Sequence, residues 1–333
     1  EGEGEGAAAS AASGRCEYAV AEAAEAARRA LRARQRRQRV IIIRHGKTRH
    51  NQLGLFTGWE DAELAVAGRA EAIAAGQLLA RHGIAVDVVY TSWLSRAIET
   101  AWLVLAELDA MHTPIYKTWR LNERMYGALT GLSKKKTKAQ YGETQFKKWR
   151  RGYDCRPPPV DSFSSHYPGN ARRYVRHVKD VPFDLRESLV RSFALGKPTL
   201  CRALPRTESL RDCMERTIPY WTGVIEAEAI ESGRSVLVAS SENAIRGLLM
   251  HLLGIPSGRI AEIEIPTGLP LLFDPESCRL SLLEGSVDAH NFGKGGAELL
   301  FGCIPADEDA PPPQPRRRRR WRRRAQALRW GRD

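Results

Sequence analysis

The alternation of strand-length apolar runs with helix-like segments is the feature that most constrains the fold of this chain. Apolar runs of strand length stand at residues 40–43, 86–92 and 235–240, and segments with helical spacing follow at 67–83, 95–108 and 243–254. This order predicts an α/β fold, with a buried, largely parallel sheet and helices on both of its faces. In such sheets ligands bind beyond the carboxyl ends of the strands, so the residues that follow each run are the first candidates for a site.

Other segments extend this pattern less regularly. We expect a helix from 137 to 151 and another that begins near Thr207, and strands at 261–265 and 269–274. Residues 155–206 are rich in Pro, Arg and Ser and have little clear periodicity. An unstructured stretch of that length in a compact domain is often a lid or a functional insert.

Composition divides the chain into three parts. Residues 1–38 form a low-complexity, Ala- and Arg-rich extension, and residues 291–333 are expected to be a disordered tail rich in Pro and Arg. The region from 39 to 290 is expected to be the folded domain, with an insert near 182–203. No run of eighteen apolar residues occurs, so we expect no membrane span.

The net charge of +13 belongs mostly to the tail, because residues 316–333 hold ten arginines and one acid. Such a block either remains a solvated tail or contacts a polyanion, and both interpretations are open. We expect a cytoplasmic protein. The alternative is a plastid or another organelle, if the N-terminal extension is the remnant of a targeting segment; its glutamates argue against this.

Chemistry-bearing residues follow the first apolar run, where Arg44 and His45 stand directly before Gly46. A neutral imidazole is a competent nucleophile toward phosphorus, and its phosphorylated product needs cations around it. Arg44 and Arg96 are suited to that role because guanidinium groups match phosphate oxygens. Gly46 would let the backbone pass close to the phosphate.

The motif extends far beyond these residues. It comprises the stretches at 44–72, 121–159, 205–210 and 264–274, which include "RHGKTRHN", "LNERMYG", "PRTESL" and "EIPTGLP". Over roughly 39–275 the chain resembles the cofactor-dependent phosphoglycerate mutases of the histidine phosphatase superfamily. The resemblance implies a three-layer α/β/α sandwich with a mostly parallel sheet. It also implies an isomerase of glycolysis and gluconeogenesis that interconverts 2-phosphoglycerate and 3-phosphoglycerate through a phosphohistidine.

Site residues are carried over from this resemblance. His45 matches the histidine that is phosphorylated, Glu123 the acid/base that moves protons, and Arg44 and Arg96 the cations around the phosphate. The implied substrate-binding positions are Asn51, Thr57, Gly58, Arg124, Tyr126, Lys134, Arg150, Arg151 and Asn243. A three-carbon acid with a carboxylate and one or two phosphates needs several cations, which agrees with this set.

The resemblance also implies a primer and an assembly. The implied cofactor is 2,3-bisphosphoglycerate, which phosphorylates His45, and we expect no metal ion. The expected ligands are small phosphorylated three-carbon acids. Relatives often form dimers or tetramers, so a homo-oligomer is an open alternative.

The second motif of that family departs from its usual pattern here. It usually reads H-G-N-S-L-R, whereas this chain has Ser241, Glu242 and then Asn243 through Arg246. Ser241 can donate a hydrogen bond but cannot carry a positive charge. Glu242 would oppose phosphate binding unless it points away, pairs with an arginine such as Arg246 or is protonated, and we expect one of the first two. Three functions are therefore weighed: a mutase of reduced activity, a histidine phosphatase, and a non-catalytic phosphoglycerate-binding or scaffold protein.

Overall fold

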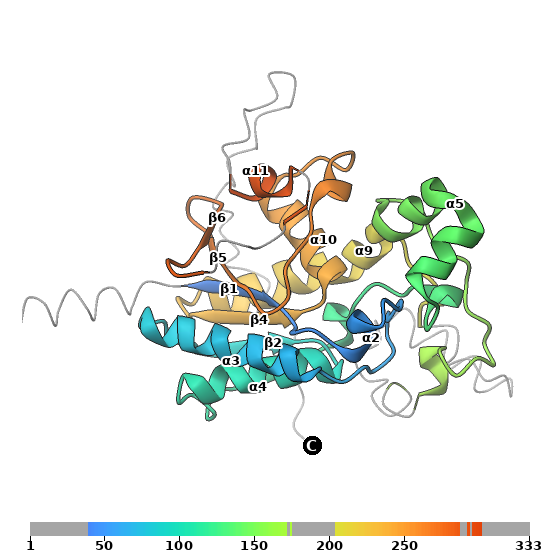
Figure 1. Ribbon diagram of the computed structural model, residues 1–333. Coiled ribbons are helices and arrows are strands. Elements are labelled where there is room, and N and C mark those ends of the chain that lie inside the picture. Colours follow the sequence, from blue (N-terminus) through green and yellow to red (C-terminus); the bar gives the residue numbers. More distant parts are fainter. Residues whose placement is uncertain (1–38, 172–173, 175–203, 287–291, 294, 302–333) are drawn as a thin grey trace, which may run out of the picture.

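The computed structural model describes residues 39–171, 174, 204–286, 292–293 and 295–301 (Figure 1). The expected N-terminal extension, the insert near 182–203 and the arginine-rich block lie outside these residues. No helix in the described ranges is long and apolar enough to cross a membrane.

A single six-stranded sheet forms the centre of the fold, with the strand order β3-β2-β4-β1-β5-β6. The strands are β1 (Val40–Arg44), β2 (Val88–Thr91), β3 (Ile115–Lys117), β4 (Val236–Ser240), β5 (Pro270–Asp274) and β6 (Arg279–Leu282). The pairings β3–β2, β2–β4 and β4–β1 are parallel, and β5 and β6 are added antiparallel at one edge. The expected mostly parallel sheet is confirmed.

Helices cover both faces of the sheet, as the alternation of apolar runs predicts (Figure 1). One layer contains α3 (Val66–Arg81) and α4 (Ser95–Glu107). The other contains α9 (Leu210–Tyr220), its π-helical continuation Trp221–Ile230, α10 (Glu242–Leu253) and α11 (Gly296–Phe301). Side chains of β1 point alternately to the two faces of the sheet: Ile41 and Ile43 pack in one apolar cluster, and Val40 and Ile42 pack in the other.

Short elements and one long helix lie beyond the carboxyl ends of the central strands. They are α2 (Arg49–Gln52), the 3₁₀ turns Trp119–Leu121, Gly127–Leu129 and Pro168–Asn170, and α5 (Lys134–Arg151). Ser133 caps the start of α5, and Gly142, at a φ of 78°, interrupts its helical geometry. Phe146 and Trp149 anchor α5 in a small aromatic cluster with Phe56. Packing therefore fixes the C-terminal part of α5, and the helix carries Lys134 at its start and the Arg150–Arg151 pair at its end.

Three details differ from the expectations. Residues 261–265 are not a strand: Ile263 and Ile265 are buried, but the segment begins with a 3₁₀ turn at Ile260–Glu262 and pairs with no strand of the sheet. The short edge strands β3 and β6 were not expected. The folded body also extends past residue 290, since Leu299 and Leu300 of α11 belong to the larger apolar core.

Candidate active site

The candidate site lies where β1 and β4 end side by side. Arg44 is paired with Ser240 in the parallel register, and the backbone N–H of His45 donates to the carbonyl of Ser240 at 2.9 Å. His45 and Ser241 therefore leave the sheet together at the carboxyl edge, which is the expected place for a ligand.

His45 is buried, and its two ring nitrogens have different partners. Nδ1 lies 2.8 Å from the carbonyl oxygen of Gly46, which can only accept, so Nδ1 carries the proton. The lone pair of Nε2 then accepts from Nε of Arg96 at 3.1 Å. Burial, followed by the charges of Arg96 and Arg44, holds the pKa of His45 well below its usual value. The imidazole is thus neutral and has its nucleophilic nitrogen against a guanidinium group.

Gly46 has a different purpose from the one expected. A Cβ atom on Gly46 would lie 2.1 Å from the carbonyl oxygen of Gly68, so the missing side chain allows the close approach of α3. The expectation that Gly46 makes room for a phosphate has no support from this contact.

Arg96 is buried and held by the backbone of the loop after α2. Its two terminal nitrogens donate to the carbonyl oxygens of Glu60 at 2.8 Å and Gly58 at 2.9 Å. Burial lowers the pKa of Arg96, while the charge of Glu123 raises it, which places Glu123 close to this guanidinium. Gly58 therefore acts on the site through its carbonyl, by orienting Arg96.

Glu123 is buried and forms a network with Asn243 of α10. Its Oε1 accepts from the side-chain amide of Asn243 at 2.9 Å and from the backbone N–H of Arg124 at 2.7 Å. The same amide group donates to the hydroxyl of Tyr126 at 3.0 Å, and the Arg124 guanidinium lies over the Tyr126 ring at 4.6 Å. The Glu123 Oε2 has only a 3.5 Å contact with the backbone N–H of Asn243, so one oxygen is left for proton transfer.

Glu242 points into the site and pairs with two arginines. Its Oε2 lies 3.0 Å from a terminal nitrogen of Arg44, and its Oε1 accepts from Arg151, which also pairs with Glu264 at 2.6 Å. The Arg44 and Arg151 charges hold the pKa of Glu242 far below its usual value despite its burial. The expectation that Glu242 pairs with an arginine is confirmed, but the partners are Arg44 and Arg151. Arg246, the arginine given as an example, donates instead to Asn243 and to the carbonyl of Ile260.

Several buried hydrogen-bond donors at the site have no partner among the residues that the structure describes. They are the hydroxyl of Ser241, Nε and one terminal nitrogen of Arg124, and Nε of Arg44 and Arg246. Buried polar atoms are nearly always paired in native proteins, because leaving one unpaired costs free energy. An anion bound here would supply acceptors for these donors.

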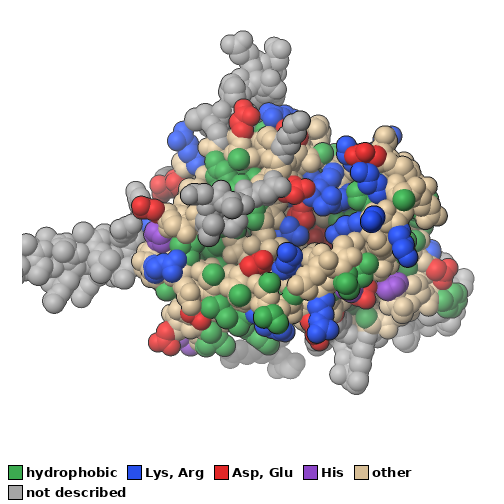
Figure 2. Space-filling model, in the orientation of Figure 1, with side chains coloured by type: hydrophobic (Ala, Val, Ile, Leu, Met, Phe, Trp, Pro, Cys, Tyr) green, Lys and Arg blue, Asp and Glu red, His purple; other side chains and the backbone are tan. Residues whose placement is uncertain are grey.

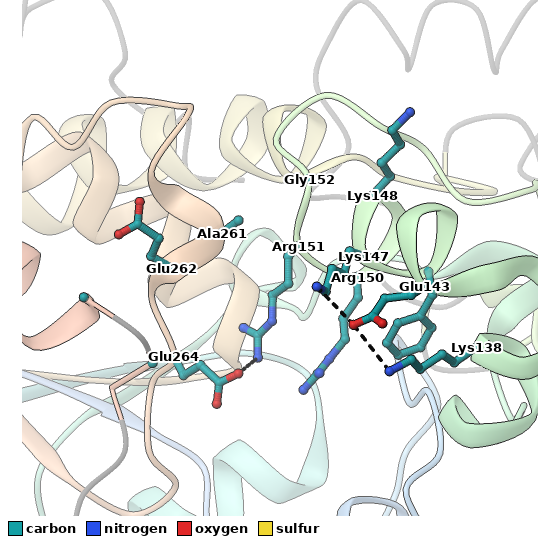
Figure 3. A pocket seen from close by; sticks show the side chains of 13 residues that line it. Lys138, Glu143, Lys147, Lys148, Arg150, Arg151, Gly152, Ala261, Glu262 and Glu264 are labelled. Atoms are coloured by element: carbon teal, nitrogen blue, oxygen red, sulfur yellow. Dashed lines mark hydrogen bonds and ion pairs between the residues drawn. The ribbon is translucent and has the colours of Figure 1, made fainter.

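Lys134 and Arg150 add positive charge from the two ends of α5. Burial, followed by the charge of Arg150, lowers the pKa of Lys134 to about 8. Arg150 and Arg151 line an open pocket of about 960 Å³ between α5 and the loop before β5, and Figure 3 shows Arg151 reaching across to Glu264. In Figure 2, Lys and Arg side chains surround the hollow beside α5. Of the residues of the candidate site, this pocket is lined by Arg150 and Arg151 and not by His45 or Glu123.

Comparison with known proteins identifies the family. The model of the histidine phosphatase superfamily (branch 1) matches residues 40–181. The chain is 44% identical over 234 residues to the 2,3-bisphosphoglycerate-dependent phosphoglycerate mutase of Clavibacter michiganensis subsp. michiganensis (strain NCPPB 382), and the alignment covers 70% of this chain and 84% of the relative. The chain belongs to the phosphoglycerate mutase family of the histidine phosphatase superfamily.

Solved structures agree with this family in fold. The mycobacterial glucosyl-3-phosphoglycerate phosphatase in complex with VO3 has a TM-score of 0.52 at 20% identity, and the match covers 74% of this chain and 96% of that one. YhfR of Bacillus stearothermophilus has a TM-score of 0.51 at 19% identity, with coverages of 75% and 98%. At such identities these likenesses show the fold alone.

Not every residue carried over from the family resemblance is linked to the central cluster. The side-chain oxygen of Asn51 accepts from the backbone N–H of Thr48 at 3.1 Å and so caps α2. Thr57 is half-buried, and its carbonyl accepts from the backbone N–H of Glu60. For these two positions the described contacts are local, and a role in binding stays a prediction.

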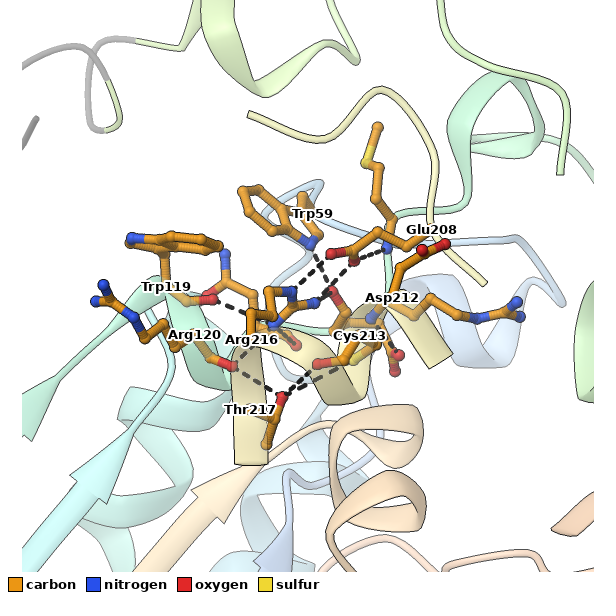
Figure 4. Close-up of polar contacts among 12 residues, drawn as sticks. Trp59, Trp119, Arg120, Glu208, Asp212, Cys213, Arg216 and Thr217 are labelled. Carbon is orange, nitrogen blue, oxygen red and sulfur yellow. Dashed lines mark hydrogen bonds and ion pairs between the residues drawn. The ribbon is translucent and has the colours of Figure 1, made fainter. Parts of the chain in front are cut away.

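One buried ion pair that supports the phosphoglycerate mutase site was not anticipated from sequence (Figure 4). Arg216 of α9 pairs with Glu208 at 2.7 Å and donates to the backbone carbonyls of Asn122 and Glu123 at 3.0 and 2.9 Å. Glu208 in turn accepts from the backbone N–H of Met125 at 2.8 Å. The pair therefore fixes the loop that carries Glu123. The sequence signal that could have revealed this pair is Arg216 itself, which lies on the same helix face as the buried Leu210 and Cys213.

Among the described residues, no group of three or more His, Cys, Asp or Glu side chains is arranged to hold a metal ion.

Proposed function

We propose that this protein is a phosphoglycerate mutase, an intramolecular phosphotransferase that interconverts 3-phosphoglycerate and 2-phosphoglycerate. The observation that carries the proposal is the neutral His45, whose Nε2 accepts from Arg96 at 3.1 Å. The 44% identity to a mutase supports it. The reaction is the isomerase step of glycolysis and gluconeogenesis.

His45 is the nucleophile and Glu123 the acid/base. With a phosphoryl group on His45 Nε2, the free hydroxyl of the substrate attacks phosphorus, the N–P bond breaks, and Glu123 takes the hydroxyl proton. In the second half, Nε2 takes the other phosphoryl group, and Glu123 returns the proton to the oxygen that leaves. Arg96 and Arg44 stabilise charge on the phosphoryl oxygens in both halves. Glu123 Oε2, whose described contact is the long one of 3.5 Å with the backbone N–H of Asn243, suits this proton exchange.

The donors at the site fit 2,3-bisphosphoglycerate as primer. When bound, this cofactor supplies the phosphoryl group that charges His45. The unpaired nitrogens of Arg124, the Ser241 hydroxyl and the cations Lys134 and Arg150 would hold its phosphates and carboxylate.

We propose that turnover is slower than in a family member with a histidine in place of Ser241. The Ser241 hydroxyl can replace the hydrogen bond but not the charge, and a donor at a developing anion is worth on the order of 10²–10³ in rate. The backbone N–H groups at the start of α10 offset part of this loss.

Phosphorus NMR of the full chain with 3-phosphoglycerate and a trace of 2,3-bisphosphoglycerate tests the proposal. Appearance of 2-phosphoglycerate supports it. Release of inorganic phosphate instead would make the protein a histidine phosphatase. Thermal stabilisation by the ligand with neither product would make it a binding or scaffold protein.

Assembly, compartment and the tail stay predictions. We propose a cytoplasmic enzyme, with an arginine-rich tail that contacts polyanions. Deletion of 316–333 should leave turnover unchanged and abolish salt-sensitive retention on heparin. Unchanged retention would place that contact on the folded body.

A further inference from the structure

Glu242 forms ion pairs with both Arg44 and Arg151. Its two carboxylate oxygens go to different arginines, one from the end of β1 and one from the end of α5. The side chains of Arg44, Arg151 and Glu242 are 15%, 11% and 16% exposed, so these ion pairs are shielded from solvent. Water therefore weakens them less than it weakens surface pairs.

The electric field of Glu242 reaches the reacting histidine. Its charge raises the pKa of His45 and that of Lys134, opposing the larger effects of burial and of neighbouring arginines. Glu242 is thus a buried anion that lies between the cations Arg44 and Arg151. It stands where a ligand anion would find the guanidinium groups of Arg44 and Arg151.

We infer that Glu242 is a specificity-determining residue, which discriminates against ligands with two phosphates in favour of ligands with one. The inference rests on the proposed function and deepens it. Repulsion from a fixed carboxylate grows with the charge of the ligand, so 2,3-bisphosphoglycerate is penalised more than 3-phosphoglycerate. In addition, Arg44 and Arg151 already have a carboxylate partner, so they offer less charge to a second phosphate. Priming of His45 therefore requires more 2,3-bisphosphoglycerate than it would without this carboxylate.

A purely structural role for Glu242 makes a different prediction. If the carboxylate only ties α5 to α10 through Arg151, its removal would loosen the site and change the affinity for both ligands by a similar factor. The ratio of the two dissociation constants separates these roles, because a general loosening cancels in that ratio.

The experiment uses Glu242→Gln in the full chain, on a His45→Asn background that cannot take up a phosphoryl group. Calorimetric titration gives Kd for 3-phosphoglycerate and for 2,3-bisphosphoglycerate. We expect Glu242→Gln to lower Kd for 2,3-bisphosphoglycerate, relative to Kd for 3-phosphoglycerate, by about tenfold or more. Glu242→Asp, which keeps the charge, should retain a ratio close to that of the parent.

Glu264→Gln is the matched control, because Glu264 also pairs with Arg151 but is 38% exposed. Glu264→Gln should change the ratio of the two dissociation constants by less than threefold, which corresponds to less than about 0.7 kcal/mol in binding free energy. If Glu242→Gln fails to fold, as judged by its thermal transition, Glu242→Gly serves as the second variant. A ratio unchanged within threefold in the folded variant, or an equal shift in Glu264→Gln, overturns the inference.

These outcomes are independent of turnover. A shifted ratio together with a parent that does not interconvert phosphoglycerates would refute the proposed function and leave the role of Glu242 intact. An unshifted ratio in a chain that does interconvert them would refute only the role of Glu242.

Discussion

Nε of Arg96 donates to Nε2 of His45 at 3.1 Å, while the opposite ring nitrogen is fixed by the carbonyl of Gly46. The tautomer and the position of the nucleophile are therefore both set before any ligand arrives. Arg96 is itself immobilised by two backbone carbonyls, so the guanidinium needs no reorganisation when charge develops on a phosphoryl group.

Arg96→Lys tests this arrangement. A lysine keeps the charge but cannot bond to His45, Gly58 and Glu60 at once. We expect phosphorylation of His45 by 2,3-bisphosphoglycerate to slow by on the order of 10²–10³, measured by rapid-quench mass spectrometry. Arg120→Lys, at a half-buried position outside this network, is the control. A rate within threefold of the parent would show that charge alone is sufficient.

Ser241→Ala should separate activity from stability. The Ser241 hydroxyl is buried, has no partner in the described part of the chain and does not cap α10, so its removal should raise the free energy of unfolding by about 1 kcal/mol. Turnover should fall, because the donor to the phosphoryl group is lost. Ser240→Ala is the matched control, since the Ser240 hydroxyl donates to the carbonyl of Leu121 at 2.6 Å and its loss should destabilise the fold. A stabilised Ser241→Ala with full turnover would exclude Ser241 from catalysis. Urea unfolding and phosphorus NMR supply the two measurements.

The ionisation of Lys134 should make kcat/KM depend on pH. Its pKa of about 8 means that the ammonium is charged below this pH and neutral above it. The value of kcat/KM for 3-phosphoglycerate, which reports the free enzyme, should therefore fall as the pH rises through about 8. Lys134→Met should have a low kcat/KM without this step, whereas Lys135→Met, at the exposed neighbour, should keep it. Persistence of the step in Lys134→Met would assign it to another group.

Substitutions of Arg216 and Glu208 should have non-additive effects on the free energy of unfolding. Arg216→Met leaves the buried Glu208 carboxylate without its main partner, so we expect a loss of about 3–5 kcal/mol in urea unfolding. The double variant Arg216→Met with Glu208→Leu removes both charges and should lose less. Equal losses in the single and double variants would mean that the ion pair does not govern the stability of the Glu123 loop.

The central strands could be predicted from sequence because β1, β2 and β4 are buried on both faces and appear as unbroken apolar runs. The edge strand β3 could not, since it has three residues and two of them are exposed. The alternating residues 261–265 resembled a strand because Ile263 and Ile265 face the core, but an alternating pattern cannot show whether a partner strand is present.

The structure brings together predicted residues that lie within one motif, whereas contacts that depend on tertiary packing were not predicted. His45, Arg96 and Glu123 follow strands or occupy a long specific motif, so the chain topology brings them together. The pairing of Glu242 with Arg151 joins residues 91 positions apart and depends on where α5 ends beside α10. The sequence shows that residue 242 is acidic, but it does not show which arginines pair with it.

The central claim is that a neutral His45 inside a cage of guanidinium groups accepts a phosphoryl group. Intact-mass spectrometry of the full chain after incubation with 2,3-bisphosphoglycerate tests it most directly. We predict one acid-labile phosphoryl adduct that maps to His45 and is absent from His45→Asn. A folded sample with no adduct, or an adduct that persists in His45→Asn, would contradict the account.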